Sequence, residues 1–214
     1  MHDTESVLRA SDEEILATIY SLKLGYRLKR TMRYGTERDH SVHTESVAEH
    51  KFALLYLMHY FLPLEDPKRL LDVGTVCSLI TFHDFGEIPN GDKPYHLKTA
   101  AHEQQEREDA RFVFDHLPPL IRHLGYERWR EYDERSTPEA RFVDALDKLE
   151  PMFELMDPVC EKSLKRMEFT YQHHIVKKLR ATEGFPVMRR FVEVGSKDML
   201  GRDVFWTGPP PATG

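Results

Sequence analysis

The sequence predicts an all-α protein built as a single helical domain, and three observations support this fold class. Apolar residues recur at helical spacing along most of the chain, and no region shows the sustained alternation expected of a strand. Several apolar runs begin at helix-capping patterns. The 214 residues suffice for one sizeable core, with two small domains as the alternative, and no internal repeat is visible.

Composition excludes several classes of function. The net charge of −6 gives no reason to expect a nucleic acid polymer as partner, although a single nucleotide remains compatible with it. Two cysteines are too few for a disulfide framework. The start of the chain lacks the basic and apolar segments of a signal peptide. No stretch approaches the roughly 20 apolar residues of a membrane helix. We therefore expect a cytoplasmic protein without membrane contact.

The first two predicted helices begin at capping patterns. Ser11 opens one of them, and Ser46, with an acid three residues later, opens the other. The second helix carries a core-facing stripe that ends at Phe61, and residues 63–67 are predicted to form a turn. Between the two helices lies a basic turn, in which Arg30 and Arg33 are candidate anion ligands.

His50 lies four residues before Leu54 and therefore projects onto the buried stripe of the second helix. Taken alone, it is better explained as a hydrogen-bonded core histidine. It becomes a candidate metal ligand because a second histidine, His83, is directly followed by Asp84 at the end of the apolar segment 76–82. Buried charges cost several kcal/mol unless they are paired or bind a metal.

Glu87 and Asp92 follow the His83–Asp84 pair closely. Glu87 is four residues after His83, so both are expected on one helix face. Pro89 and Gly91 then end the helix, which returns Asp92 towards the same end. A segment predicted to be core thus contains several converging polar groups, which indicates a site.

The helix expected from residue 137 supplies a further acid. At 100° per residue, Glu150 lies about 60°, Asp147 about 120° and Asp144 about 180° from the centre of its apolar face. This places Asp144 in solvent and leaves Asp147 and Glu150 at the edge of the core. Other helices are expected over 99–116, from residue 120, and over 164–180 and 187–193. His173, His174, Lys177 and Lys178 are expected on an exposed face.

The domain is predicted to cover residues 1–200, and the Gly- and Pro-rich residues 201–214 are predicted to form a flexible tail. Within the domain, His50, His83, Asp84 and Asp147 come from three helices. Two imidazoles and two carboxylates suit one divalent metal ion, with cobalt, manganese, magnesium, zinc and iron as candidates.

At these residues the chain resembles the HD-domain phosphohydrolases, and among them the small 5′-deoxynucleotidases. The resemblance covers residues 22–151 and rests on four segments: 28–33, 45–50, 83–92 and 140–150. It implies a metal held at His50, His83, Asp84 and Asp147, with Glu87 and Asp92 as the catalytic acids. It also implies a phosphate-binding arginine that best matches Arg30, with Arg33 beside it, and a homodimer.

The expected activity is therefore removal of phosphate from (deoxy)nucleoside 5′-monophosphates. In the bacterial deoxynucleotidases an aromatic residue follows the arginine and helps reject a 2′-hydroxyl, whereas Thr31 follows Arg30 here. The alternatives are phosphodiester hydrolysis, a two-metal oxygenase, and a regulatory domain that binds a nucleotide without turnover. Glu87 and Asp92 argue against the last of these, because a pure binder needs no such acids beside the metal.

Overall fold

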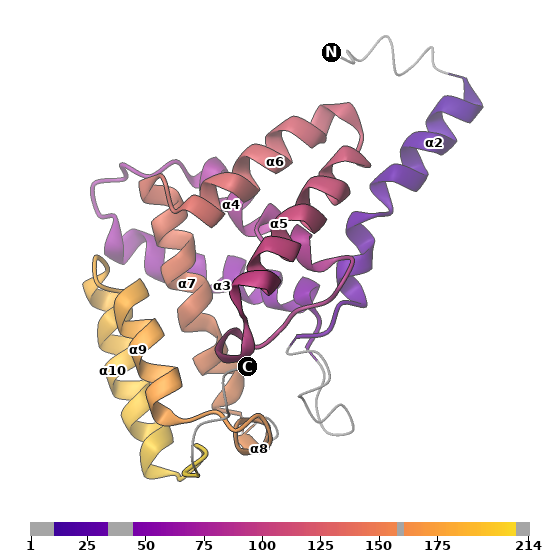
Figure 1. The fold of residues 1–214 in the computed structure, drawn as a ribbon. Coiled ribbons are helices and arrows are strands. Elements are labelled where there is room, and N and C mark those ends of the chain that lie inside the picture. The colour runs from indigo at the N-terminus through magenta and orange to yellow at the C-terminus, as the bar shows by residue number, and fades with distance from the viewer. Residues whose placement is uncertain (1–10, 34–44, 158–160, 209–214) are drawn as a thin grey trace.

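The computed structural model describes residues 11–33, 45–157 and 161–208, and in these residues the fold is a bundle of α-helices (Figure 1). Extended pairing in this part of the chain consists of one isolated antiparallel bridge, between Met32 and Ser46. The all-α prediction is confirmed. The α-helices are α2 (Asp12–Leu22), α3 (Val47–Glu65), α4 (Val73–Phe82), α5 (Ala100–Asp115), α6 (Pro119–Glu134), α7 (Pro138–Leu155), α8 (Glu161–Arg166), α9 (Tyr171–Ala181) and α10 (Pro186–Gly201).

Capping decides where the predicted helices begin. Ser11 and Ser46 each form a capping box, with Glu14 and Glu49 respectively, as expected. The helix before the His83–Asp84 pair starts at Val73, because the Asp72 side chain accepts the Thr75 amide at 2.6 Å.

Pro63 does not end α3, contrary to the predicted turn at 63–67. The helix continues to Glu65 and ends at Asp66, whose amide bonds to the carbonyl of Leu62. A proline in the last turn removes only one helical hydrogen bond, so the helix can finish through it.

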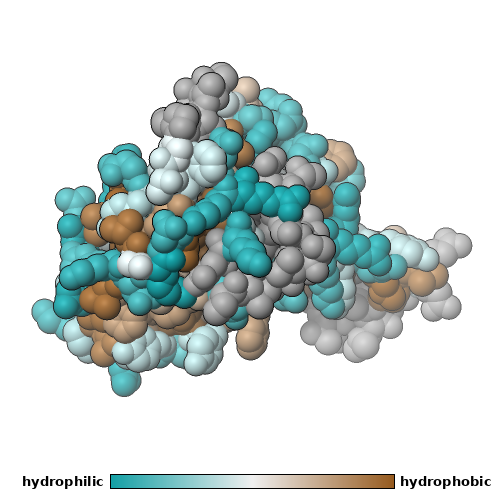
Figure 2. All heavy atoms as spheres, turned by 90° about the horizontal axis from the view of Figure 1, so that it is seen from below, coloured by the Kyte–Doolittle hydropathy of each residue, from teal (hydrophilic) through white to brown (hydrophobic). Residues whose placement is uncertain are grey.

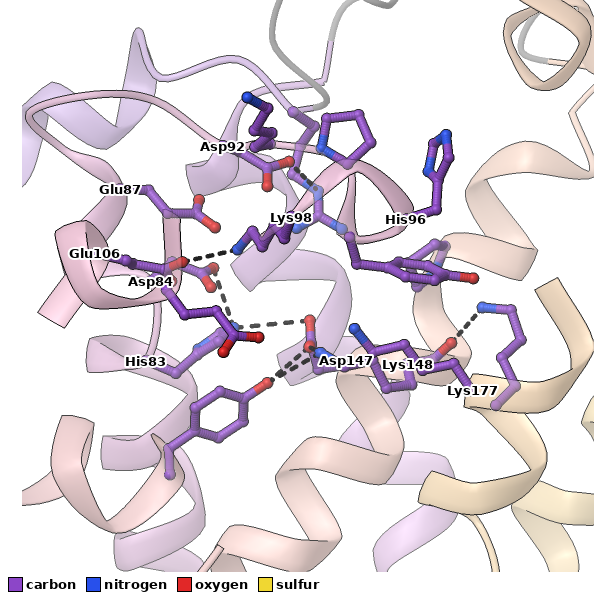
Figure 3. A pocket seen from close by; sticks show the side chains of 18 of the residues that line it. His83, Asp84, Glu87, Asp92, His96, Lys98, Glu106, Asp147, Lys148 and Lys177 are labelled. Carbon is purple, nitrogen blue, oxygen red and sulfur yellow. Dashed lines mark hydrogen bonds and ion pairs between the residues drawn. The ribbon is translucent and has the colours of Figure 1, made fainter. Parts of the chain in front are cut away.

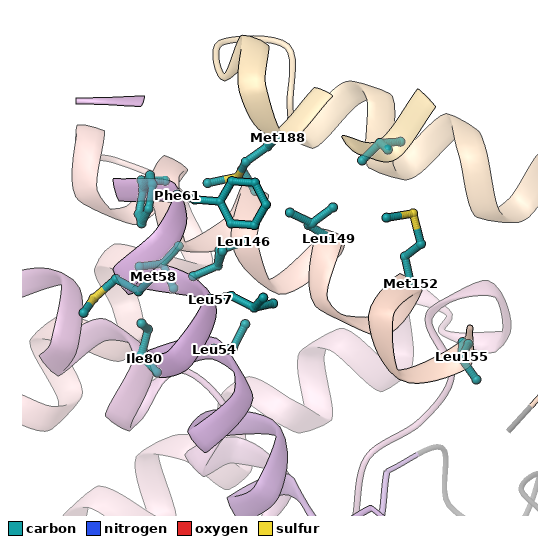
Figure 4. Close-up of a cluster of buried hydrophobic side chains, with 14 of the residues drawn as sticks. Leu54, Leu57, Met58, Phe61, Ile80, Leu146, Leu149, Met152, Leu155 and Met188 are labelled. Carbon is teal, nitrogen blue, oxygen red and sulfur yellow. The ribbon is translucent and has the colours of Figure 1, made fainter. Parts of the chain in front are cut away.

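Helix α7 lies at the centre of the bundle and packs against α3, α4, α6, α8, α9 and α10 (Figure 1). Its Leu146 and Leu149 are fully buried and meet Phe61 of α3 and Met188 of α10 in the main core (Figure 4). A second apolar cluster, around Phe114, joins α5 and α6 to the end of α4. The site is thus carried by helices that are fixed by two adjoining cores.

The central position of α7 corrects the expectation for Asp144. This side chain is buried, not solvent-facing, and its Oδ2 lies 3.0 Å from Arg135 Nε at the end of α6. Lys148 Nζ lies 3.9 Å from the other carboxylate oxygen. A helical wheel assumes one covered face, whereas α7 is covered on several sides, so an acid opposite the apolar face is buried against cations.

Helix α9 corrects a second expectation, the exposed face at 173–178. His174 and Lys178 are buried, because one face of α9 packs against α7 and α10. The predicted helix over 164–180 is also divided into α8 and α9 by a break at Glu168, which has a positive φ of 52°.

Burial of His174 leads to a testable pH dependence of stability. Burial and the nearby Lys178 lower the pKa of His174 to about 2. Unfolded chains bind a proton at this residue below about pH 6.5, so the free energy of unfolding falls as the pH drops. We expect His174→Gln to reduce this fall by about 1 kcal/mol between about pH 7 and about pH 5.5, measured by urea denaturation.

Ser196→Ala is the matched control for this prediction. Ser196 lies 2.9 Å from His174 Nε2 and is itself buried. Its loss should lower stability at every pH without changing the slope, because serine does not titrate. Equal slopes for His174→Gln and the parent protein would contradict the predicted effect.

The packed chain extends beyond the boundary predicted at residue 200. Val204 and Phe205 are buried in the main core, and the Trp206 amide donates to the carbonyl of Phe169 at 3.0 Å. Residues 209–214 lie outside the described residues. In the part of the chain that the structure covers, no helix combines the length and apolarity needed to cross a bilayer.

The N-terminal helix α2 projects from the bundle, at the upper right of Figure 1. Its Leu16, Ile19 and Leu22 are exposed, and hydrophobic side chains are visible at this side of the molecule in Figure 2. Ser21 ties its end to the bundle by donating a hydrogen bond to the carbonyl of His116.

Candidate functional site

Three helices bring the four predicted metal ligands together. His50 lies in the first turn of α3, His83 caps the C-terminus of α4 and is followed by Asp84, and Asp147 lies in the middle of α7. All four side chains are buried. His50 and Asp147, nearly 100 positions apart in sequence, therefore meet in the bundle, and Figure 3 shows His83, Asp84 and Asp147 on one side of the pocket.

The distances define a tight cluster. His50 Nε2 lies 2.9 Å from Asp147 Oδ1, and His83 Nε2 lies 3.8 Å from the same oxygen. His83 Nε2 is also 3.0 Å from Asp84 Oδ2. One ligand atom each of His50, His83 and Asp84 can be chosen so that all three lie within 4.8 Å of one another.

Both imidazole rings are oriented through their Nδ1 atoms. His50 Nδ1 lies 2.8 Å from Glu150 Oε2, and His83 Nδ1 lies 3.0 Å from the carbonyl oxygen of Ile80. A carbonyl can only accept, so His83 carries its proton on Nδ1 and presents an Nε2 lone pair to the cluster. Such outer partners are the ones that commonly fix metal-binding histidines.

The donor atoms of this cluster fit a cation. His83 Nε2 and Asp84 Oδ2 are both buried and form no hydrogen bond, although they face each other. A lone pair opposite a carboxylate oxygen is unfavourable unless positive charge lies between them. Two nitrogen and two oxygen donors are also a suitable set for a divalent transition metal.

The pKa values in the cluster show how strongly it favours positive charge. Burial and Arg33 lower the pKa of His50, but Glu150 and the bonds to both carboxylates outweigh them and raise it to about 10. For Asp84, burial raises the pKa, while His83 and Lys51 lower it well below the ordinary value. The site therefore holds ionised carboxylates in a buried place.

Asp147 is held through its second oxygen. Tyr132 donates its hydroxyl to Oδ2 at 2.7 Å, and the Lys148 ammonium contacts the same atom. The other oxygen, Oδ1, is thereby directed towards His50 and His83. The two donors keep the carboxylate in one rotamer, which preorganises it for a ligand.

Glu87 reaches the site from a short 3₁₀ turn (Phe85–Glu87), not from the α4 helix face that the spacing suggested, because α4 ends at Phe82. A Cβ atom on Gly86 would stand 2.8 Å from the carbonyl oxygen of Glu106, so glycine lets this turn lie directly on α5. Glu87 is buried, and its Oε2 has no hydrogen-bond partner. Burial, with Asp92 and Asp84 nearby, raises its pKa well above the usual value.

Asp92 is positioned by the turn and by Arg33. Gly91 adopts φ 83°, which favours glycine. The Asp92 Oδ2 atom lies 3.9 Å from Arg33 Nε, and Arg33 Nε is 3.7 Å from Glu45 Oε2. Asp92, Arg33 and Glu87 all line the same pocket.

The structure separates the two candidate arginines. Arg33 is buried and lines the pocket, whereas Arg30 is exposed and does not line it. The bridge beside Ser46 accounts for this: the Arg33 amide donates to the carbonyl of Glu45 at 2.9 Å and so fixes Arg33 beside the start of α3. Thr31 is buried and does not line the pocket either.

The pocket has a volume of about 280 Å³ and contains functional groups that sequence reasoning missed. Tyr132, Lys98, Lys148 and Lys177 all line it, and Figure 3 labels the three lysines. Lys148 could have been found, because it directly follows Asp147. Tyr132 and Lys177 come from helices, and Lys98 from the loop before α5, and their sequences carry no separate signal, so only the packing reveals them.

The chain is similar to several known proteins. A family model described as HD domain matches residues 26–188. Curated relatives named 5′-deoxynucleotidase HDDC2 are 29% identical over 140 residues in Xenopus laevis, 28% over 131 residues in Homo sapiens and 30% over 131 residues in Mus musculus.

These matches cover 64%, 60% and 60% of this chain, and the matched region spans just under two thirds of each relative, 66%, 62% and 63%. A crystal structure described as a predicted metal-dependent phosphohydrolase from Magnetospirillum magnetotacticum has a TM-score of 0.74 and 24% sequence identity. It covers 96% of this chain and is itself covered completely, so the two share a fold.

Proposed function

Because this chain belongs to the HD domain family, we propose that it is a metal-dependent phosphohydrolase that removes phosphate from deoxynucleoside 5′-monophosphates. The observation that carries the proposal is the buried cluster in which His83 Nε2 faces the carboxylates of Asp84 at 3.0 Å and Asp147 at 3.8 Å. Metal ligands in this arrangement would be His50, His83, Asp84 and Asp147. The name of the HDDC2 relatives supports the substrate class.

The chain's own residues can be assigned roles in this reaction. A divalent ion at the cluster supplies positive charge beside the phosphate and lowers the pKa of water towards about 7. Glu87, with its raised pKa and an unpartnered oxygen, takes the proton of the attacking water. Asp92 positions the substrate close to its leaving oxygen, and Arg33 binds phosphate oxygens with its planar fork.

The position of Arg33 changes the argument on sugar preference. If Arg33, not Arg30, is the phosphate-binding arginine, the residue that follows it is Tyr34. An aromatic residue then occupies the position that rejects the 2′-hydroxyl in the bacterial enzymes, and Thr31 has no part in the choice. An aromatic residue at this position favours deoxyribonucleotides over ribonucleotides as substrates. Tyr34 itself lies outside the described residues.

A nucleotide panel tests the proposal. Purified protein, loaded separately with cobalt, manganese, magnesium, zinc or iron, would be assayed for phosphate release from ribo- and deoxyribonucleoside 5′-monophosphates. We expect release from the deoxyribonucleotides with at least one metal, and Tyr34→Ala should narrow the preference for deoxyribose. Absence of release from every nucleotide would refute the substrate class. Metal analysis in parallel should find one ion per chain, whereas two irons would favour an oxygenase.

Lys51 should support the metal site without touching the metal. It follows His50 on α3 and is buried, and its ammonium donates to the carbonyl of Thr81 at 2.9 Å. The same ammonium lies 4.8 Å from the ring centroid of Phe85. Lys51 thus caps the C-terminal carbonyls of α4 and holds the turn on both sides of His83–Asp84. We expect Lys51→Met to weaken metal binding by about tenfold or more, measured by chelator competition.

Lys51→Arg is the matched variant, because it keeps the positive charge and the donors. It should recover a large part of the metal affinity that Lys51→Met loses. If Lys51→Met folds normally and binds metal as tightly as the parent protein, the turn does not depend on this lysine.

The homodimer also stays a prediction. Sedimentation equilibrium of the purified protein would test it directly.

A further inference from the structure

Helix α9 contributes two adjacent lysines, Lys177 and Lys178, to the wall of the pocket. In Figure 3 Lys177 lies on the far side of Asp147 and Lys148 from Glu87 and Glu106. Neither lysine has a role in the proposed removal of phosphate at the metal cluster.

The two α9 lysines lack an acidic partner, unlike most of the other cations of the pocket. Eight lysine and arginine side chains line the pocket, and five of them pair with a carboxylate. Lys93 lies 2.9 Å from a nitrogen of His102. The five paired cations are Arg33, Lys98, Arg107, Arg135 and Lys148. In the described part of the chain, no carboxylate lies within ion-pair distance of Lys177 or Lys178.

The contacts of the two α9 lysines leave the Lys177 ammonium available to a ligand. Lys178 is buried and donates its ammonium to the backbone carbonyl of Lys148. Lys177 is half-buried, and its ammonium lies 4.1 Å from the ring centroid of Tyr95. A cation on an aromatic face keeps its N–H groups available on the other side. Lys177 can therefore donate to a group inside the pocket.

The surroundings of the α9 lysines make an anion favourable. Burial lowers the pKa of Lys177 to about 8 and that of Lys178 to about 7; Lys148 lowers both further, while the carboxylates of Asp147 and, for Lys178, Glu150 act in the opposite direction. A half-buried ammonium that has no carboxylate partner costs free energy. A bound anion would offset this cost at Lys177.

We propose that Lys177, with Lys178 behind it, forms a second phosphate-binding subsite of the pocket, separate from the metal ligands. The inference rests on the proposed function, since it assumes that a phosphate ester enters this pocket. The phosphate to be cleaved must lie beside His83, Asp84 and Glu87, where Arg33 also points. A phosphate at Lys177 is therefore either a second phosphate group of the substrate or the phosphate released by the reaction.

Substrates with one and two phosphates distinguish these sources. The kcat/KM values for a deoxynucleoside 5′-monophosphate and the corresponding 3′,5′-bisphosphate would be measured, together with inhibition by inorganic phosphate. If the subsite holds a second substrate phosphate, Lys177→Met should lower kcat/KM for the bisphosphate about tenfold and that for the monophosphate less than about twofold. If it holds the released phosphate, the variant should instead raise the inhibition constant of inorganic phosphate about tenfold and leave the ratio of the two substrates unchanged.

Two further variants show that the effect belongs to the Lys177 ammonium. Lys177→Arg should retain the behaviour of the parent protein, because it keeps a cation over Tyr95. Lys197→Met removes an exposed lysine of α10 that does not line the pocket, and it should change nothing. The subsite is refuted if Lys177→Met changes neither the ratio of the two kcat/KM values nor the inhibition constant of phosphate. It is also refuted if the variant lowers kcat/KM equally for both substrates without affecting inhibition by phosphate.

Failure of the proposed function would be recognised separately. If the parent protein releases phosphate from no nucleotide, titration calorimetry with inorganic phosphate still tests the subsite, because binding needs no turnover. Weaker phosphate binding by Lys177→Met than by the parent and Lys197→Met would support it. Equal binding by all three proteins would overturn it.

Discussion

Asp147→Asn is expected to abolish phosphate release and to weaken metal binding by at least about a hundredfold. Its Oδ1 atom lies between the two imidazoles, 2.9 Å from His50 Nε2 and 3.8 Å from His83 Nε2. The amide that replaces it carries no charge, and it cannot offset the positive charge of a bound ion as the carboxylate does. The measurements are metal content after gel filtration, metal affinity by chelator competition, and phosphate release.

Asp144→Asn is the matched control, because Asp144 is also a buried acid of α7, one helical turn before Asp147. It pairs with Arg135 and Lys148 and does not line the pocket. Its substitution should cost stability, since the buried Asp144 side chain loses its ion pairs with Arg135 and Lys148, but metal affinity should stay within about threefold of the parent. Equal loss of metal in both variants would mean that Asp147 acts on folding and not as a ligand.

Glu87→Gln is expected to lower kcat by about 10² to 10⁴ while metal content is retained. Glutamine keeps the size of the side chain but cannot take a proton from water. The parent carboxylate is buried, its Oε2 has no hydrogen-bond partner, and burial with Asp92 and Asp84 nearby raises its pKa, so it holds a proton more strongly than an ordinary glutamate does. Steady-state kinetics with the best nucleotide of the panel, together with metal analysis, would measure both quantities.

Glu103→Gln provides the comparison for Glu87. Glu103 also lines the pocket, from the first turn of α5, but its side chain is exposed. The kcat of the Glu103→Gln variant should remain within about twofold of the parent value. If Glu87→Gln and Glu103→Gln behave alike, Glu87 has no role in proton transfer. If Glu87→Gln loses its metal, the glutamate acts at the metal and not on the water.

The sequence predicted which segments form helices, because the signals are local. It predicted less well where each helix begins and ends. The Ser46 capping box and the stripe of α3 are local patterns, so a sequence shows them directly. Pro63 and the start of α4 depend on which single hydrogen bonds are lost or gained in one turn, as the Asp72 cap shows. Such small differences in free energy are not visible in hydrophobic periodicity.

The errors on burial share one cause. Asp144 was expected in solvent because it lies opposite the apolar stripe of its own helix, and His174 because it stands beside two lysines, yet both are buried by neighbouring helices. A helical wheel describes one helix and contains no information about what covers its other sides. Polar residues between several helices are therefore the ones that sequence reasoning misplaces, and two of the groups involved, Lys148 and Lys178, line the pocket.

The sequence by itself determined the all-α class, most of the helices, and which four residues should meet, because caps, periodicity and the His83–Asp84 pair are local features read through a known family resemblance. Only the tertiary structure decided that Arg33 and not Arg30 reaches the pocket, that Glu150 orients His50, and that Lys177 lies in its wall. The physical reason is that these relations join segments far apart in the chain. Their distances follow from how helices pack, which no single segment encodes.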